Sequence, residues 1–414
     1  MNFDEFEKIL KTNGQEHILR SYERLDEQGK EKLINQVAGI DFEKMKNLYE
    51  LTQKAPAYTE SVIEPAPYVD SAKLSDEEKS EYIKVGEEAI RNNKLAVVTM
   101  AGGQGTRLGH SGPKGTFDIG LPSHKSIFEI ECDILKEANN KYGVTIPWYI
   151  MTSNDNHDET IEFFEKNNYF NYPKTELDYF FSQNELPMLS EEGKIILNEE
   201  GLIKLAADGH GGVFEALVTC GILNDMEKRG VEWLFAATID NVLVKMADPL
   251  FIGYAIKNGY KIASKTLPKV SPEERVGVFC KKDGKPSVIE YTEISKELAS
   301  LRDENGELVY GEAHVMLNLF NISALKEIEK YKLPFHPAHK KTTYMDEEGN
   351  IIVPDKPNAY KFETFLFDAF VKMPEIGLLR GKREVDFSPV KNAEGVDSPE
   401  TARRDYMRFH GIKE

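Results

Sequence analysis

Short apolar, β-branched runs alternate with amphipathic segments of helix length from residue 95 onwards, and this alternation constrains the fold most strongly. The run at 95–100 precedes a helical pattern at 126–140, and a second run at 146–152 precedes another at 156–167. The alternation continues through VEWLFAATID, DPLFIGYAIKNG and YKIASKTL. Strands that alternate with helical crossovers of about 10–15 residues build a parallel sheet covered by helices. We therefore predict an α/β fold with a mostly parallel central sheet.

The first 92 residues show a different pattern. Apolar residues at helical spacing, such as Phe3 and Leu10, stand among dense charge and predict helices. Ser75 and Glu78 form a capping box, which predicts a helix that ends near residue 92. Between the two helical stretches, three prolines at 54–70 predict an extended connector, because proline fixes φ and lacks the N–H that a helix requires.

The charge balance excludes some classes of partner. The 52 lysines and arginines against 70 acidic residues give a formal net charge of −18, which repels nucleic acid and anionic membranes. No apolar run approaches the roughly 20 residues of a membrane span. The three cysteines are widely spaced and suit neither a disulfide framework nor a thiolate metal site. Because the N-terminus also lacks the apolar run of a signal peptide, we expect a cytoplasmic protein that binds neither nucleic acid nor membranes.

A glycine-rich loop, AGGQGTRLGHSGPKG, follows the first apolar run at 101–115. It meets neither standard phosphate-binding motif. Lys114 follows Pro113 where a P-loop needs Gly-Lys-Ser/Thr, and Leu108 replaces the third glycine of G-x-G-x-x-G. A tight turn is one interpretation. However, Arg107 and Lys114 give the loop two cations that a turn does not need, and glycines let a backbone approach a ligand closely, so we favour a triphosphate-binding loop.

Further motifs follow this loop in order along the chain. They are FFSQNELPML, LAADGHGGVFEAL, ATIDNVLVKMADPLFIG, RVGVFCKKDGKPSVIEYTEIS, YKFETFLFDAF and REVDFSPVKNAEGVDSPETARR. Together with the glycine loop, these blocks resemble the eukaryotic-type UDP-sugar pyrophosphorylases, most of all the UDP-N-acetylglucosamine pyrophosphorylase branch. The resemblance implies a Rossmann-like, GT-A-like nucleotidyltransferase fold. Three parts are then expected: a helical N-terminal region with the proline-rich connector (1–92), a nucleotide-binding catalytic core (93–330) and a C-terminal part that completes the sugar-phosphate site (331–414).

The resemblance also implies a reaction, in which UTP and N-acetylglucosamine 1-phosphate give UDP-N-acetylglucosamine and pyrophosphate. The sugar phosphate attacks the α-phosphorus in line, so the protein has to position the reactants and neutralise charge, with Mg²⁺ as cofactor. Arg107, Lys114 and Lys391 are the implied catalytic residues, which hold the phosphates and the developing charge. Gly102 and Gly103 are implied to approach the nucleotide.

The resemblance assigns the remaining site residues as well. Asp240 is the implied ligand of Mg²⁺, although an aspartate after a strand can also cap a helix. Gln183 and the backbone at Gly209 are implied to read uracil, since a side-chain amide can donate and accept across the imide edge. The implied sugar-binding residues are His210, Gly277, Glu290 and Tyr291. Lys361, Glu363, His314 and Asn318 lie in family blocks, but no role is assigned to them.

Alternatives remain open at this point. The N-acetylglucosamine branch typically has asparagine at the position of His210, whereas the UDP-glucose branch has a Gly-His-Gly segment there. Imidazole can donate to a hydroxyl or to an acetamido carbonyl, so glucose 1-phosphate or another hexose 1-phosphate is the alternative substrate. More distant alternatives are an NAD(P)-dependent oxidoreductase that uses the glycine loop, and a UDP-sugar-binding protein without activity.

Overall fold

The computed structural model describes residues 1–54, 61–177 and 179–413. The chain forms two compact units, each assembled from three separate segments. Unit 1 contains Met1–Glu60, Asn184–Gly212 and Leu333–Phe365, and unit 2 contains Ser61–Gln183, Val213–Lys332 and Leu366–Glu414. These boundaries differ from the three consecutive parts expected from the sequence. Residues 55–60, which belong to the predicted connector, lie outside the described residues.

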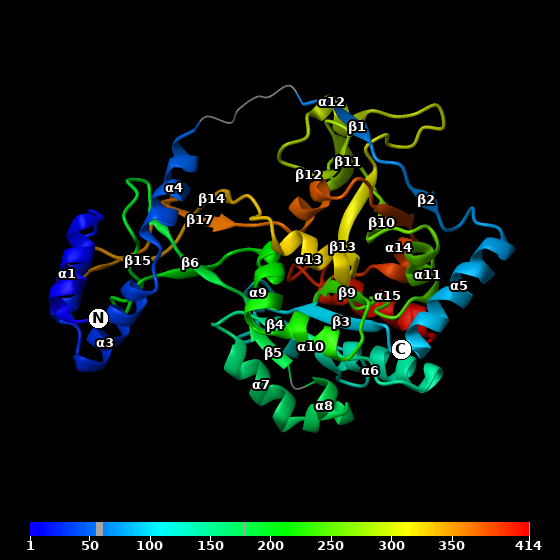
Figure 1. Ribbon diagram of the computed structural model, residues 1–414, viewed down its shortest axis with the longest axis horizontal. Helices are drawn as coiled ribbons and strands as arrows, with labels where there is room; N and C mark the ends of the chain where they lie inside the picture. Colours follow the sequence, from blue (N-terminus) through cyan, green and yellow to red (C-terminus); the bar gives the residue numbers. More distant parts are fainter. Residues whose placement is uncertain (55–60, 178, 414) are drawn as a thin grey trace. The chain divides into compact units, whose positions relative to one another are not determined.

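Unit 2 is built on an eleven-stranded sheet (Figure 1), whose main path has the order β2-β18-β10-β13-β9-β3-β4-β5, with β1, β11 and β12 paired off this path. The strands are β1 (Ile63–Pro65), β2 (Val69–Asp70), β3 (Leu95–Met100), β4 (Trp148–Thr152), β5 (Tyr179–Ser182), β9 (Trp233–Thr238), β10 (Ile262–Pro268), β11 (Val278–Lys282), β12 (Lys285–Ile289), β13 (Glu312–Asn321) and β18 (Gly377–Arg380). The predicted α/β class with a mostly parallel central sheet is confirmed.

Strand direction determines where a ligand can meet the sheet. β3 runs parallel to β4 and β9, and β10 runs parallel to β18. β13 lies between β9 and β10 and is antiparallel to both, so β9 and β10 point the same way. The carboxyl ends of β3, β9, β10 and β18 therefore share one edge. In open α/β sheets this edge is where ligands bind.

Helices join and cover the strands of unit 2. They are α5 (Asp76–Arg91), α6 (Ile127–Tyr142), α7 (His157–Lys166), α8 (Lys174–Leu177), α9 (Val213–Thr219), α10 (Ile222–Lys228), α11 (Pro249–Lys257), α12 (Lys296–Ser300), α13 (Ile322–Glu329), α14 (Arg383–Asp386) and α15 (Pro399–His410). The predicted capping box is confirmed, because the Ser75 side chain accepts the N–H of Glu78 and the Glu78 side chain accepts that of Ser75. None of the helices in the described part of the chain is long and apolar enough to cross a membrane.

The close approach of α5 and α11 depends on glycine. A Cβ atom on Gly86 would lie 2.0 Å from the carbonyl oxygen of Pro249, and one on Gly253 would lie 1.7 Å from that of Tyr82. Backbone atoms cannot yield as a flexible side chain can. The two helices can therefore pack this closely only because neither position carries a side chain.

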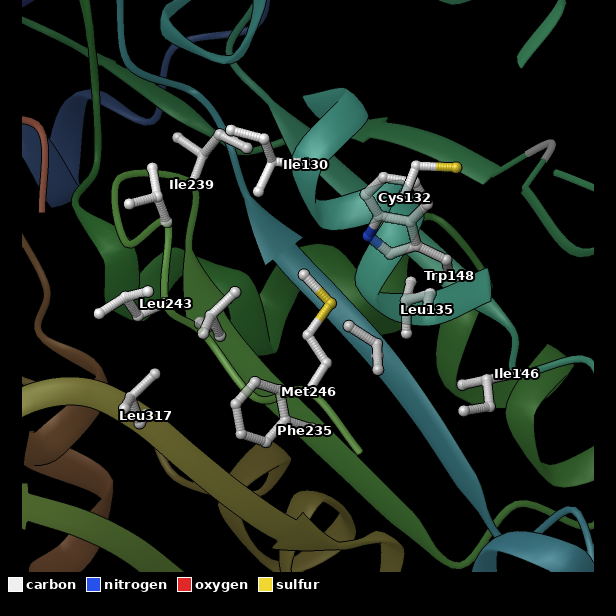
Figure 2. Packing of buried hydrophobic residues seen from close by; sticks show 14 of the residues in the cluster. Ile130, Cys132, Leu135, Ile146, Trp148, Phe235, Ile239, Leu243, Met246 and Leu317 are labelled. Atoms are coloured by element: carbon white, nitrogen blue, oxygen red, sulfur yellow. The ribbon is translucent and has the colours of Figure 1, made fainter. Parts of the chain in front are cut away.

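The core of unit 2 lies against both faces of β3, whose six residues are all buried. Figure 2 shows Trp148 of β4 packed beside α6, and Phe235 of β9 close to Met246. The indole N–H of Trp148 donates to the Thr99 hydroxyl at 2.9 Å, and that hydroxyl donates to Glu131 at 2.8 Å. Burial raises the pKa of Glu131 to about 8, so this carboxyl group is largely protonated at neutral pH.

The described residues of unit 1 form four α-helices and three small sheets. The helices are α1 (Phe3–Thr12), α2 (His17–Arg24), α3 (Glu27–Ala38) and α4 (Phe42–Gln53). The sheets comprise β14-β17-β7, β15-β16 and β6-β8, with the bounds β6 (Glu185–Pro187), β7 (Leu189–Ser190), β8 (Leu205–Ala207), β14 (His336–Lys340), β15 (Tyr344–Met345), β16 (Ile351–Ile352) and β17 (Ala359–Glu363). Phe6 and Leu10 of α1 share one core with Ile195 and Phe362. Burial of such large apolar side chains contributes roughly 1.5–3 kcal/mol each.

Candidate active site

The glycine loop leaves β3 and closes on itself. The N–H of Gly105 donates to the carbonyl of Gly112 at 2.9 Å, and the N–H of Lys114 donates to that of Gly103 at 3.0 Å. The buried Asn156 side chain donates to the carbonyl of Ala101 at 2.9 Å and so fixes the start of the loop. The loop therefore returns Lys114 to the carboxyl end of the strand.

Lys114 faces Asp240, which follows β9 at the same edge. Its Nζ lies 3.8 Å from Oδ2 of Asp240, and the two side chains are 17% and 13% exposed. Burial lowers the pKa of Lys114 and outweighs the attraction of Asp240, while Lys391 and Arg107 lower it further. Burial alone would raise the pKa of Asp240, but Lys114 and Lys391 together bring it below the ordinary value. Asp240 is therefore ionised at neutral pH.

Lys391 reaches this place because its segment is hydrogen-bonded to the Asp240 turn. The N–H of Val390 donates to the carbonyl of Asp240 at 2.8 Å. The Asn241 side chain accepts the N–H of Ser388 at 2.9 Å and donates to the carbonyl of Asp386 at 2.8 Å. Lys391 itself is exposed, and its Nζ lies 5.3 Å from the ring centroid of Phe387.

A buried ion cluster supports the same segment. Lys265 of β10 places its Nζ 2.6 Å from Asp248 and 2.7 Å from Asp386. Burial lowers the pKa of Lys265, but the two carboxylates outweigh this effect and raise the pKa overall. The cluster therefore stabilises the charged form of Lys265, in contrast to the situation of Lys114.

Arg107 completes the group of cations. It lies exposed on a 3₁₀ turn, Thr106–Leu108, within the glycine loop. Its charge contributes to lowering the pKa of Lys114, so the two cations lie within electrostatic range of each other. The structure thus brings together Arg107, Lys114, Asp240 and Lys391, which are far apart in the sequence.

Gly102 and Gln183 also lie together. Gln183 follows β5 and is 9% exposed, and its N–H donates to the carbonyl of Thr152 at 2.9 Å. A Cβ atom on Gly102 would lie 3.1 Å from Nε2 of Gln183 and 3.3 Å from the N atom of Ser153. At Gly103, by contrast, no heavy atom among the described residues would lie within 4 Å of such a Cβ. Gly102 therefore leaves room for the Gln183 amide, while Gly103 borders open space.

Gly277 and Glu290 form a second close pair. They flank the antiparallel β11–β12 pair, in which Val278 lies opposite Ile289. A Cβ atom on Gly277 would lie 2.9 Å from Oε1 of Glu290. Tyr291, the next residue, is 45% exposed.

Gly209 and His210 belong to unit 1. The φ of Gly209 is 88°, a conformation that favours glycine, and a Cβ atom there would lie 2.4 Å from the carbonyl oxygen of Thr364. The His210 ring lies 5.4 Å from that of Phe365. In this unit, too, Lys361 and Glu363, which have no assigned role, form an ion pair at 2.9 Å.

His314 and Asn318 lie inside unit 2. Both are buried on β13, and Nε2 of His314 lies 3.2 Å from Oδ1 of Asn318. The Ser264 hydroxyl donates to the same oxygen at 2.7 Å. Both residues therefore take part in a buried hydrogen-bond network of unit 2.

The residues at the edge are suited to one divalent cation bound with phosphates. The described ranges contain no group of three or more His, Cys, Asp or Glu side chains that could hold a metal. Mg²⁺ commonly uses only one or two carboxylates and takes its other ligands from phosphate oxygens and water. An ionised Asp240 meets that requirement.

Sequence reasoning missed residues that build the site. Asn156 fixes the glycine loop and Asn241 fixes the Lys391 segment. Asp397 interacts electrostatically with both Lys114 and Lys391. The only sequence signal for Asp397 was its place in the last family block, next to a serine that caps α15.

Sequence comparison finds relatives along most of the chain. The UTP–glucose-1-phosphate uridylyltransferase family matches residues 41–396. UDP-N-acetylhexosamine pyrophosphorylase-like protein 1 of Homo sapiens is 38% identical over 422 residues, which cover 97% of this chain and 83% of that protein. UDP-N-acetylglucosamine pyrophosphorylase of Saccharomyces cerevisiae is 36% identical over 419 residues, with coverages of 96% and 88%.

Comparison with solved structures finds similar proteins as well. The crystal structure of UDP-N-acetylglucosamine pyrophosphorylase from Trypanosoma brucei, in complex with an inhibitor, matches with a TM-score of 0.82 and 31% identity, over 97% of this chain and 84% of that chain. UDP-glucose phosphorylase from the same organism matches with a TM-score of 0.65 and 17% identity, over 90% and 76%. The second match shows the likeness of fold alone.

Proposed function

The chain belongs to the UTP–glucose-1-phosphate uridylyltransferase family of UDP-sugar pyrophosphorylases, and on this basis we propose that it makes UDP-N-acetylglucosamine. In this reaction the phosphate oxygen of N-acetylglucosamine 1-phosphate forms a bond to the α-phosphorus of UTP. The bond between that phosphorus and the bridging oxygen breaks, and pyrophosphate leaves. Family membership thus favours uridylyl transfer over the oxidoreductase that the glycine loop also suggested.

The observation that carries the proposal is the meeting of Lys114, Asp240 and Lys391 at one sheet edge. A transferred phosphoryl group needs positioning and neutralisation of charge rather than a covalent nucleophile. The Lys114 side chain is largely buried. A cation interacts more strongly with a developing negative charge where water is excluded. We assign Lys114 and Arg107 to the β- and γ-phosphates and Lys391 to the sugar phosphate.

Asp240 is the proposed contact for Mg²⁺. A carboxylate beside a site for a polyanion would repel the substrate unless a cation lies between them. An Mg²⁺ ion held by Asp240 would supply positive charge that neutralises part of the charge on the phosphates. Lys114 and Lys391 keep Asp240 ionised and ready to bind the ion.

The uridine and sugar ends are assigned from their surroundings. Gln183 presents a side-chain amide next to Gly102, which supports its role in reading uracil. The assignment of the Gly209 backbone to the same base rests on the family resemblance alone. The Glu290 carboxylate lies so close to Gly277 that a Cβ there would clash with it, and this carboxylate can accept hydrogen bonds from sugar hydroxyls. We assign Glu290 and Tyr291 to the sugar ring. For His210, the assignment to the C2 substituent rests on the family resemblance alone.

The choice of sugar is the finer part of the proposal. The Trypanosoma brucei structure named for N-acetylglucosamine has nearly twice the sequence identity of the one named for UDP-glucose, which supports N-acetylglucosamine 1-phosphate. His210 is the feature that favours glucose 1-phosphate. The three cysteines are free in the structure, as is usual in a reducing compartment, and on this ground we further propose that the reaction takes place in the cytoplasm.

The test measures pyrophosphate release from UTP and Mg²⁺ with N-acetylglucosamine 1-phosphate, N-acetylgalactosamine 1-phosphate and glucose 1-phosphate in separate reactions. We expect the highest kcat/KM with N-acetylglucosamine 1-phosphate. Equal or better turnover of glucose 1-phosphate would refute the sugar assignment but retain uridylyl transfer. No release with any of the three would refute the proposed function itself.

A further inference from the structure

His110 lies in the glycine loop between the two cations and makes a side-chain hydrogen bond across the loop. Its Nε2 lies 2.7 Å from the hydroxyl oxygen of Thr116. That hydroxyl donates in turn to the carbonyl oxygen of Pro113 at 2.8 Å. A hydroxyl has one hydrogen and a carbonyl can only accept, so both contacts form only if the N–H at Nε2 of His110 donates to Thr116. The two contacts together therefore place a proton on Nε2.

The bond joins the two turns that carry the cations of the loop. Arg107 lies in the 3₁₀ turn Thr106–Leu108, and Lys114 opens the 3₁₀ turn Lys114–Thr116. His110 follows the first turn by two residues and is bonded to the last residue of the second turn. The side-chain bond thus connects the chain next to Arg107 with the turn that begins at Lys114.

The imidazole ring is held in place by its neighbours in the loop. A Cβ atom on Gly105 would lie 2.8 Å from Cδ2 of His110, and one on Gly112 would lie 3.6 Å from its Nε2. The ring therefore lies beside both glycines, whose backbones are joined by the hydrogen bond described above. The Phe117 ring packs edge-on against the imidazole, with the centroids 5.5 Å apart. These contacts leave His110 half-buried and give its ring a defined orientation.

The backbone alone does not fix the spacing of the two turns. The two backbone hydrogen bonds across the loop start at Gly105 and Lys114 and do not reach residues 106–111. The connection between the turns contains Gly109 and Gly112, with φ values of 69° and 138°. Glycine loses more conformational freedom on folding than any other residue, so a connection of this kind is costly to order. A side-chain bond across it restricts this freedom.

We propose that His110 is a positioning residue for Arg107 and Lys114: its imidazole N–H, bonded to the Thr116 hydroxyl, fixes the spacing of these two cations. The inference rests on the proposed function, in which both cations serve the β- and γ-phosphates of UTP. It adds a residue that acts on the phosphates through two other side chains.

Substitutions can separate the hydrogen bond from the packing of the ring. His110→Phe keeps an aromatic ring beside Phe117 but lacks the N–H donor, whereas His110→Gln offers an amide N–H in its place. Thr116→Val removes the hydroxyl with little change of shape. His124→Phe is the matched control. His124 also makes a side-chain hydrogen bond in a loop, to Asp118 at 3.0 Å, but it is 81% exposed and lies outside the glycine loop.

The experiment measures the Kd of UTP and that of UMP by calorimetry, both with Mg²⁺, because only UTP carries the β- and γ-phosphates. The ratio of the Kd of UMP to that of UTP, the UTP preference, reports what these phosphates add to binding. We expect His110→Phe and Thr116→Val to lower the UTP preference about tenfold, since a shift of about 1 Å in a positioned group can cost up to two orders of magnitude. The Kd of UMP should stay unchanged. His110→Gln should retain most of the UTP preference, and His124→Phe should retain all of it.

A double variant tests whether the bond itself carries the effect. His110→Phe combined with Thr116→Val should bind UTP no more weakly than either single variant, because both substitutions remove the same interaction. A general distortion of the loop would instead weaken UMP and UTP alike and would make the two losses add.

The proposal is overturned by an unchanged UTP preference in His110→Phe, by an equal loss in His110→Gln, by losses that add in the double variant, or by UMP and UTP affected alike. A wild-type protein that binds UTP no better than UMP overturns it as well, because the loop would then hold no phosphates. If the wild-type protein releases no pyrophosphate with any sugar phosphate, the proposed function fails, and the binding ratios still decide the role of His110.

Discussion

Replacing Lys114 with methionine should remove activity without destabilising the protein. The gross attraction between Lys114 and Asp240 at 3.8 Å is about 4 kcal/mol at an effective dielectric constant of 20. Burial opposes this attraction, and so does repulsion from Lys391 and Arg107, and the lowered pKa of Lys114 shows that the opposing effects prevail. The charged lysine is thus a net cost to the folded state, which Lys114→Met relieves.

The lowered pKa of Lys114 also determines how the stability of the folded protein depends on pH. Because the folded-state pKa of Lys114 lies below the unfolded value, the unfolded chain binds more protons in the interval between the two values, and the stability of the wild type rises with pH there. Lys114→Met lacks this contribution. Its advantage in Tm should therefore be present at neutral pH and shrink as the pH rises toward about 10.4, the ordinary lysine pKa.

The assay combines thermal unfolding at neutral and alkaline pH with pyrophosphate release. We expect kcat to fall about 10²–10³-fold, the usual effect of removing one donor to developing charge, while Tm at neutral pH stays equal or rises. Lys265→Met is the matched control. It removes the buried cation between Asp248 and Asp386 and leaves Asp386 the more exposed Lys245 as an ion-pair partner, so it should cost up to about 3–5 kcal/mol. A clear fall in Tm for Lys114→Met would refute the energetic reasoning, and full activity would refute the catalytic assignment.

Three glycine substitutions give further predictions. Gly102→Ala places a methyl group against the Gln183 amide, so KM for UTP should rise severalfold with Tm nearly unchanged; an unaltered KM would contradict the uracil assignment. Gly277→Ala crowds Glu290 and should raise KM for the sugar phosphate but not for UTP, which steady-state kinetics with each substrate varied would reveal. Gly253→Ala forces a methyl group onto a carbonyl of α5 and should destabilise unit 2 by about 1–3 kcal/mol, seen as a lower Tm; a wild-type Tm would mean that the helices separate freely.

Local signals in the sequence predicted the parts of the fold that local physics determines. β3 reads as a strand because a strand buried on both faces is a continuous apolar run. The capping box at Ser75 predicted the start of α5 correctly. Lys114 and Asp240 could be expected to approach each other because each follows a strand, and neighbouring parallel strands end at one edge.

The division into two units could not be predicted in this way. Unit 1 joins residues near the N-terminus, such as Phe6, to residues as distant as Ile195 and Phe362. Such contacts depend on surface complementarity, which leaves no periodic pattern in the chain. The antiparallel position of β13 between β9 and β10 could not be predicted for the same reason.

The burial of particular polar residues was also not predicted from the sequence. Glu131 and Lys265 read as ordinary surface charges on a helix and a strand, since ionisable side chains are almost never fully buried unless paired. The structure buries both, one against Thr99 and the other between two carboxylates. Asn156 stands at the start of a predicted helical pattern, and that pattern gives no sign that its side chain holds the glycine loop in place.

The most direct test of the central claim follows the α-phosphorus of UTP. The protein is incubated with Mg²⁺, N-acetylglucosamine 1-phosphate and UTP that carries a radioactive α-phosphate, and the products are separated from the protein. Direct transfer at the Lys114–Asp240–Lys391 site predicts that all label lost from UTP appears in UDP-N-acetylglucosamine, with one pyrophosphate released per transfer and none of the label on the protein. A failure of any label to leave UTP, or label that becomes bound to the protein, would contradict this account.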